Sequence, residues 1–198
     1  MLLGAYVLGA IPFGVLVARR MGIDILSVGS GNIGATNVHR VAGPRAGIAV
    51  FILDIAKGFV PAYLALNTLH STEWSFGVGV AAVAGHCFSP FLSFKGGKGI
   101  ATTFGVLLGS VAPVALTAFA VFVSLVVVTR YVSVASMVAA TFAAILCFVF
   151  HEPPIVCWVF ALLAIIIVYR HRSNIARRSE EHTSELQSHL NLVCRLLL

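Results

Sequence analysis

The chain has 198 residues, of which 59% are hydrophobic and only 10% are charged, and its formal net charge is +6. Soluble domains carry roughly 25% charged residues, so this composition excludes a water-soluble globular protein. The basic residues flank apolar runs and form no stripe with interleaved aromatic residues, which argues against nucleic acid as a partner. We predict an all-α fold, an integral membrane helix bundle whose single domain covers residues 1–177.

Apolar runs of membrane-spanning length, about 20 residues each, follow one another along the chain. They cover residues 2–18, 46–66, 75–91, 131–150 and 154–169, together with a longer run at 99–129. Pro12 interrupts the first run. The run at 99–129 is too long for one comfortable span, so we expect two helices joined by a tight turn at 110–113. The sequence thus predicts about seven transmembrane helices.

The distribution of basic residues predicts how these helices are oriented. Seven spans place three loops on one side, at 67–74, around Pro113 and around His151, and none of them contains Lys or Arg. The loops that contain the basic residues all fall on the other side. Because basic loops stay in the cytoplasm, we expect the N-terminus outside and the polar motifs described below on the cytoplasmic side.

The C-terminal segment differs abruptly from the rest of the chain. From Arg178 the sequence becomes polar and charged, and RSEEHTSELQS matches the translation of a widely used sequencing adapter. We therefore predict that residues 178–198 are a non-native tail and exclude them from the functional interpretation. The alternative is a genuine amphipathic or disordered tail.

The first polar cluster is GSGNIGATNVHR, in the loop after the first span. Its glycines allow the backbone to approach a ligand closely, and its short polar side chains add neutral hydrogen-bonding groups. Arg40 adds a fixed positive charge suited to phosphate or carboxylate. The other candidate site residues of this cluster are Gly29, Ser30, Gly31, Asn32 and Asn37. The alternative is a flexible glycine-rich linker.

The second cluster lies before the run at 99–129 and contains a small-residue loop with two lysines. Its candidate residues are Lys95, Gly96, Gly97, Lys98 and Gly99. Backbone amides at the start of a helix, together with ammonium groups, form a cradle for phosphate. The alternative is a pair of lysines that only fixes orientation. Upstream, Phe88, Phe91 and Phe94 recur every three residues, either to line an acyl-chain groove or to anchor the loop at the membrane interface.

The third cluster, YRHRSNI, ends the last span, and it contains His171 and Asn174 on one helix face, with Arg172 between them. A stop-transfer signal explains the arginines but not the other two residues. Asp54 and Lys57 form a further polar pair inside the second span. Ionisable groups at that depth are costly, so the pair either neutralises itself or contacts substrate.

Several classes of chemistry lack support in the sequence. No GxSxG elbow, HExxH motif or acidic metal cage is present, and the four cysteines form no CxxC pair. We therefore expect a site without metal or cofactor that recognises phosphate and stabilises negative charge. A membrane transporter of a phosphate-containing solute is the alternative function, although the two halves of the chain show no repeat.

The motifs GSGNIGATNVHR, LDIAKG, GHCFSPFLSFKGGKGIAT and YRHRSNIAR, in this order, resemble the bacterial acyl-phosphate:glycerol-3-phosphate acyltransferase family (PlsY-type). The resemblance extends to about Arg177. It implies transfer of a fatty acyl group from acyl phosphate to the 1-hydroxyl of sn-glycerol 3-phosphate, without a metal or other cofactor. The products are lysophosphatidic acid and phosphate, formed in the bacterial inner membrane as the first acylation of phospholipid synthesis.

The resemblance also implies roles for individual residues. The expected catalytic residues are Ser30, Arg40, Lys98, His171 and Asn174. The expected substrate-binding residues are Gly29, Gly31, Asn32, Asn37, Lys57, Lys95, Gly96, Gly97, Gly99 and Arg172. The hydroxyl proton goes either to the phosphate of the donor or to His171 as a general base. The family's glutamate after the last motif has no equivalent here, and Glu180 and Glu181 are no substitutes for it.

Overall fold

A computed structural model describes residues 1–172 and 174, and in this part every regular element is a helix. The elements are α1 (Leu2–Ala10), α2 (Phe13–Arg20), α3 (Ala35–Ala42), α4 (Pro44–Leu69), α5 (Thr72–Cys87), η1 (Pro90–Leu92), α6 (Ile100–Ser110), α7 (Ala112–Thr129), α8 (Val132–Val149) and α9 (Pro154–Arg170). The all-helical prediction is confirmed. The tail predicted from residue 178 lies outside the described residues.

Five segments are long and apolar enough to cross a membrane. They are Leu2–Arg20, Pro44–Leu69, Thr72–Leu92, Ala112–Thr129 and Val132–Val149. The apolar helices α6 and α9 are shorter, although both form where the sequence predicted a span. The predicted apolar runs therefore all become helices, while a count of seven crossings stays a prediction.

Proline shapes the two places where an apolar run divides. Pro12 has no backbone N–H to donate, and the helix is interrupted at Ile11 and Pro12, between α1 and α2. The tight turn predicted at 110–113 is also present. There α6 ends at Ser110, and Pro113 occupies the first turn of α7, where a missing N–H costs nothing.

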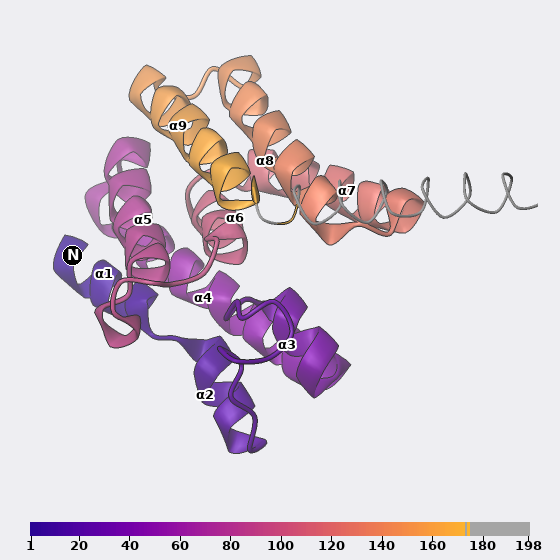
Figure 1. Cartoon of the computed structure of the whole chain (residues 1–198). Helices are drawn as coiled ribbons and strands as arrows, with labels where there is room; N and C mark the ends of the chain where they lie inside the picture. The colour runs from indigo at the N-terminus through magenta and orange to yellow at the C-terminus, as the bar shows by residue number, and fades with distance from the viewer. Residues whose placement is uncertain (173, 175–198) are drawn as a thin grey trace, which may run out of the picture.

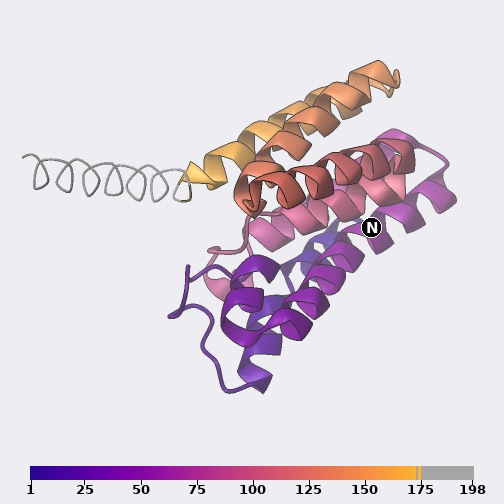
Figure 2. The ribbon, with the colours of Figure 1, turned by 90° about the vertical axis from the view of Figure 1, so that its right-hand side faces the viewer.

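Helix α4 is the centre of the bundle and packs against α3, α5 and α6 (Figure 1). Glycines bring α4 and α6 into close contact: Gly58 lies against the backbone of Thr102, and Gly105 lies against Ile55. Small residues allow membrane helices to approach this closely. Helices α7, α8 and α9 pack in sequence beside this group, as the rotated view also shows (Figure 2). The packing brings the end of α9 close to the start of α6.

The loop between the first two predicted spans is a compact structure that contains α3. Its apolar side chains form a core with α2 and the start of α4, and Ile25, Val38 and Val50 are fully buried there. The sequence analysis did not predict α3, because this helix has only eight residues and lies within a polar motif that contains several glycines. This packing excludes a flexible linker, which was the alternative for the first cluster.

Candidate active site

Asn37 organises the first cluster from within. Its side chain is buried, its Oδ1 accepts a hydrogen bond from the backbone N–H of Ser30 at 2.9 Å, and its Nδ2 donates to the carbonyls of Asn32 at 3.0 Å and Val28 at 3.2 Å. One side chain thereby closes the loop around Ser30. Gly29 has a φ of +63°, and a methyl group there would overlap Asn37 Oδ1, so the loop requires glycine.

The second cluster is held by residues outside it. The N–H groups of Gly96 and Gly97 donate to the carbonyls of Cys87 and His86, both at 3.1 Å. Gly99, with a φ of +83°, is the N-cap of α6. From the end of α9, Arg170 Nη2 lies within hydrogen-bond range of the carbonyls of Cys87 at 3.4 Å and Gly96 at 3.3 Å. The Arg170 guanidinium also lies 5.4 Å from the centroid of the Phe88 ring.

His171 and Asn174 join this second loop to the end of α9. The side chain of His171 is buried, and its Nδ1 lies 2.9 Å from the carbonyl of Ile167. A carbonyl only accepts, so Nδ1 carries the proton and Nε2 keeps a lone pair in the neutral ring. Burial lowers the pKa of His171 below its ordinary value of 6.5, which favours that neutral form. Lys98 Nζ donates a hydrogen bond to Asn174 Oδ1.

A buried cluster of ionisable side chains lies between the break that separates α1 from α2 and the second loop. Lys57 Nζ is 2.8 Å from Asp54 Oδ1 and donates to the carbonyl of Ile11 at 3.0 Å. His86 Nδ1 is 3.7 Å from the same Asp54 oxygen. The Lys57 ammonium therefore neutralises Asp54 and gives a second hydrogen bond to the Ile11 carbonyl, which also accepts from the N–H of Phe13 at 3.1 Å. Lys57 is not among the residues that line the cavity described next.

All three clusters line one cavity of about 130 Å³. It includes all five residues expected to be catalytic, namely Ser30, Arg40, Lys98, His171 and Asn174. Of the expected substrate-binding residues, Asn32, Asn37 and Gly99 also line it. The others lie outside its lining: Gly29, Gly31, Lys57, Lys95, Gly96, Gly97 and Arg172. Gly29, Gly96 and Gly97 shape the two loops instead, and the Arg172 guanidinium stacks on Tyr169.

The cavity also includes polar residues that sequence reasoning did not assign to the site. His86, Ser133 and Ser136 contribute to its lining, as does Asp54. In the sequence these residues appear only as a histidine near the end of one apolar run and as two serines near the start of another. Serines are common in membrane helices, so that signal is weak by itself.

A second, apolar cavity continues from the polar one. Five residues line both cavities, which makes the two contiguous: Phe51, Ile100, Ala101, Phe122 and Ser136. The apolar cavity extends between α6, α7, α8 and α9. The three phenylalanines upstream of the second cluster, Phe88, Phe91 and Phe94, line neither cavity, and their side chains are at least half exposed. Their position fits the interfacial anchor rather than the acyl-chain groove.

The family model described as glycerol-3-phosphate acyltransferase matches residues 1–181. The chain belongs to the glycerol-3-phosphate acyltransferase family. The glycerol-3-phosphate acyltransferase of Geobacter sulfurreducens is 44% identical over 177 residues, covering 89% of this chain and 91% of the relative. That of Aquifex aeolicus is 43% identical over 174 residues, covering 87% and 91%. This acyltransferase therefore matches its relatives over nearly their whole length.

Two crystal structures of PlsY (YgiH), an integral membrane glycerol 3-phosphate acyltransferase, also resemble this acyltransferase, each at 41% identity over 91% of this chain and 90% of theirs. The glycerol 3-phosphate form matches with a TM-score of 0.86, and the lysophosphatidic acid form with 0.83. The chain is thus a membrane glycerol-3-phosphate acyltransferase, as the sequence motifs predicted.

Proposed function

We propose that this acyltransferase takes its acyl group from acyl phosphate and transfers it to the 1-hydroxyl of sn-glycerol 3-phosphate. The observation that carries the proposal is that one polar cavity combines Arg40, Lys98 and the N-terminus of α6 and continues into an apolar cavity. Two cationic groups and a helix N-terminus favour two phosphates at close range. The nearby Asp54 carboxylate opposes this charge little, because Lys57 neutralises it.

Each of the five residues expected to be catalytic has a role that follows from its chemistry. Arg40 and Lys98 bind the two phosphates and stabilise the negative charge that develops on the acyl oxygen and the leaving phosphate. Ser30 and Asn174 orient the substrates through neutral hydrogen bonds, and Asn174 also positions Lys98 through the bond between them. Acyl phosphate is already activated, so orientation and charge stabilisation supply most of the catalysis.

The reaction itself is a substitution at the acyl carbon. The 1-hydroxyl oxygen forms a bond to the carbonyl carbon, the bond from that carbon to the phosphate oxygen breaks, and phosphate leaves with the electron pair. The hydroxyl proton has two acceptors, an oxygen of the donor's phosphate and Nε2 of His171. His171 suits this role, since its proton is on Nδ1 and its pKa is lowered.

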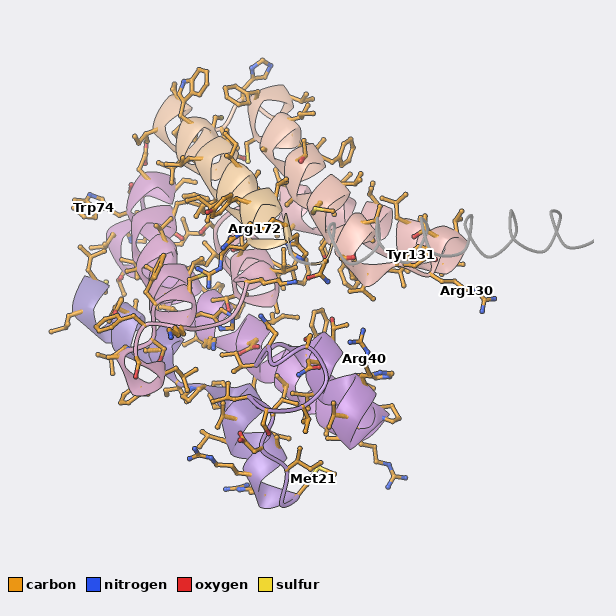
Figure 3. The ribbon with its side chains drawn as sticks, viewed as in Figure 1. Met21, Arg40, Trp74, Arg130, Tyr131 and Arg172 are labelled. Carbon is orange, nitrogen blue, oxygen red and sulfur yellow. The ribbon has the colours of Figure 1, made fainter. Side chains whose placement is uncertain are left out.

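We also propose that the polar cavity faces the cytoplasm of the bacterial inner membrane, with seven spans and the N-terminus outside. Arg40 and Arg130 lie toward the end of the bundle opposite to Trp74 (Figure 3), which agrees with basic loops on the cytoplasmic side. One cysteine introduced at Ser27 or at Asn67, in a chain with Cys194→Ser whose other native cysteines Cys87, Cys147 and Cys157 are buried, tests this orientation. In intact cells an impermeant maleimide should label Asn67→Cys and not Ser27→Cys; the reverse pattern would overturn it.

The choice of donor is tested with the purified protein and labelled glycerol 3-phosphate. Palmitoyl phosphate, palmitoyl-CoA and palmitoyl acyl carrier protein are supplied in parallel, and labelled lysophosphatidic acid is measured. We expect product from acyl phosphate alone, and its loss in Ser30→Ala and Lys98→Ala variants that remain folded. Product from palmitoyl-CoA without product from acyl phosphate would contradict the proposed donor.

A further inference from the structure

We infer that His86 is a positioning residue of the second loop, whose imidazole determines where Gly97 and the adjoining Lys98 lie. Asp54, itself paired with Lys57, holds the imidazole through its other ring nitrogen. The inference rests on the proposed phosphate-binding role of Lys98, because a residue that moves this loop also moves the Lys98 ammonium along the wall of the polar cavity.

The main chain and the side chain of His86 both contact the second loop. The carbonyl of His86 accepts a hydrogen bond from the N–H of Gly97 at 3.1 Å. Its imidazole fills the space beside the same glycine, because a methyl group on Gly97 would overlap Nε2 and come within 2.8 Å of Cε1. One residue of α5 thus fixes Gly97 from two directions, and Lys98 is the next residue along the chain.

The burial of this imidazole needs a reason beyond packing. The His86 side chain is 4% exposed, and within the part of the chain that the structure describes its Nδ1 is enclosed and makes no hydrogen bond. Burying a nitrogen without a hydrogen bond costs free energy that an apolar side chain of similar size would not. A histidine at this position therefore indicates that the polar ring has a use.

Asp54 supplies the electrostatic attraction that orients the ring. Its Oδ1 lies 3.7 Å from Nδ1 of His86, which is too long for a hydrogen bond but short enough for a strong attraction. A carboxylate only accepts, so the ring carries its proton on Nδ1, toward Asp54, and keeps its Nε2 edge against Gly97. Lys57 fixes this carboxylate at 2.8 Å and is itself bound to the Ile11 carbonyl at 3.0 Å. Helix α4 thereby determines the position of the loop through His86.

A double-mutant cycle of His86→Asn and Gly97→Ala tests the inference through kcat/KM for glycerol 3-phosphate. Asparagine ends before Nε2 and Cε1, the two ring atoms nearest to the new methyl group. Gly97→Ala alone should lower kcat/KM about a hundredfold, and His86→Asn alone about tenfold, because the loop loses its support. In the His86→Asn background, Gly97→Ala should cost no more than about threefold, a coupling typical of residues in direct contact. Losses that multiply to about a thousandfold would overturn the inference.

The role of Asp54 is tested by combining Asp54→Leu with Lys57→Met, which removes both charges and leaves no buried charge unpaired. We expect kcat/KM to fall about threefold when His86 is present and to stay unchanged in the His86→Asn background, because Asp54 acts through the ring. An equal fall in both backgrounds would show that Asp54 acts without His86, and would overturn this part of the inference.

His70→Asn is the matched control, because His70 is exposed at the end of α4 in a left-handed conformation that asparagine tolerates. It should not rescue Gly97→Ala, and equal rescue by both asparagines would overturn the inference. Rates are expressed per folded protein, measured as the monodisperse fraction in detergent. If Gly97→Ala does not fold, the recovery of folded protein in the double variant is measured instead, and no recovery would overturn the inference. The assay uses the acyl donor that the wild-type protein accepts, so a wrong assignment of the donor does not affect the result.

Discussion

The two glycine-rich loops of the candidate active site are stabilised in opposite ways. The loop around Ser30 is organised by Asn37, which is seven residues away in the same motif. The loop around Gly97 depends on groups outside it, the carbonyls of α5 and the guanidinium of Arg170, which is 74 residues from Gly96. The first loop therefore forms as a local unit, whereas the second forms only when α5, α6 and α9 are packed together.

The largest effect is expected from Asn37→Ala, which removes the organising side chain of the first loop. Buried carbonyls that lose their donor cost about 1–3 kcal/mol each, so we expect about 3 kcal/mol of destabilisation and loss of activity on the order of a hundredfold. Thermal unfolding in detergent measures the destabilisation, and initial rates measure the loss of activity. The control is Asn67→Ala, whose side chain is exposed and donates only to the Tyr63 carbonyl. Equal effects at both positions would contradict the role of Asn37.

Gly97→Ala tests whether the second loop depends on its neighbours. An added methyl group would overlap the buried His86 imidazole, so the loop must shift. A displacement near 1 Å at a catalytic site costs about a hundredfold in rate. Gly77→Ala on α5 is the matched control, because no atom lies within 4 Å of its new methyl group. Wild-type kcat/KM in Gly97→Ala would show that the loop tolerates the movement.

Arg170→Lys tests the comparison by removing the guanidinium that supports the second loop while keeping a positive charge at position 170. Lysine lacks the planar fork and loses the contact with the Phe88 ring. We expect kcat/KM to fall about tenfold, the equivalent of about 1.4 kcal/mol. Arg45→Lys, at an exposed position on α4, should stay near the wild-type value. Unchanged kinetics in Arg170→Lys would mean that backbone hydrogen bonds alone hold the loop.

The smallest effect concerns the titration of His171. Its folded pKa lies below the ordinary 6.5, so the unfolded chain binds a proton at a higher pH than the folded protein does. Stability should therefore decrease as the pH falls through 6.5, and activity that needs a neutral Nε2 should decrease with it. Ring-nitrogen NMR of labelled histidine reports this pKa directly. A value above 6.5 would mean that His171 acts as a cation beside phosphate.

The contrast between local and long-range stabilisation also explains which features could be predicted from the sequence. The break at Pro12, the turn before Pro113 and the polar groups around Ser30 depend on neighbouring residues, and each was predicted. The contact of Arg170 with Gly96 and the hydrogen bond from Lys57 to the Ile11 carbonyl depend on packing between distant helices. No spacing in the chain encodes those distances. The sequence left two roles open for Lys57, substrate binding or neutralisation of Asp54, and in the structure its ammonium forms an ion pair with Asp54.

The two loops converge at Lys98, which lines the cavity shared with Ser30 and donates a hydrogen bond to Asn174. The most direct test of the proposed reaction supplies purified protein with acyl phosphate and glycerol 3-phosphate and counts both products. We predict lysophosphatidic acid and free phosphate in equal amounts, with both lost together in a folded Lys98→Ala variant. Phosphate release without lysophosphatidic acid, or full transfer in Lys98→Ala, would contradict the proposed site.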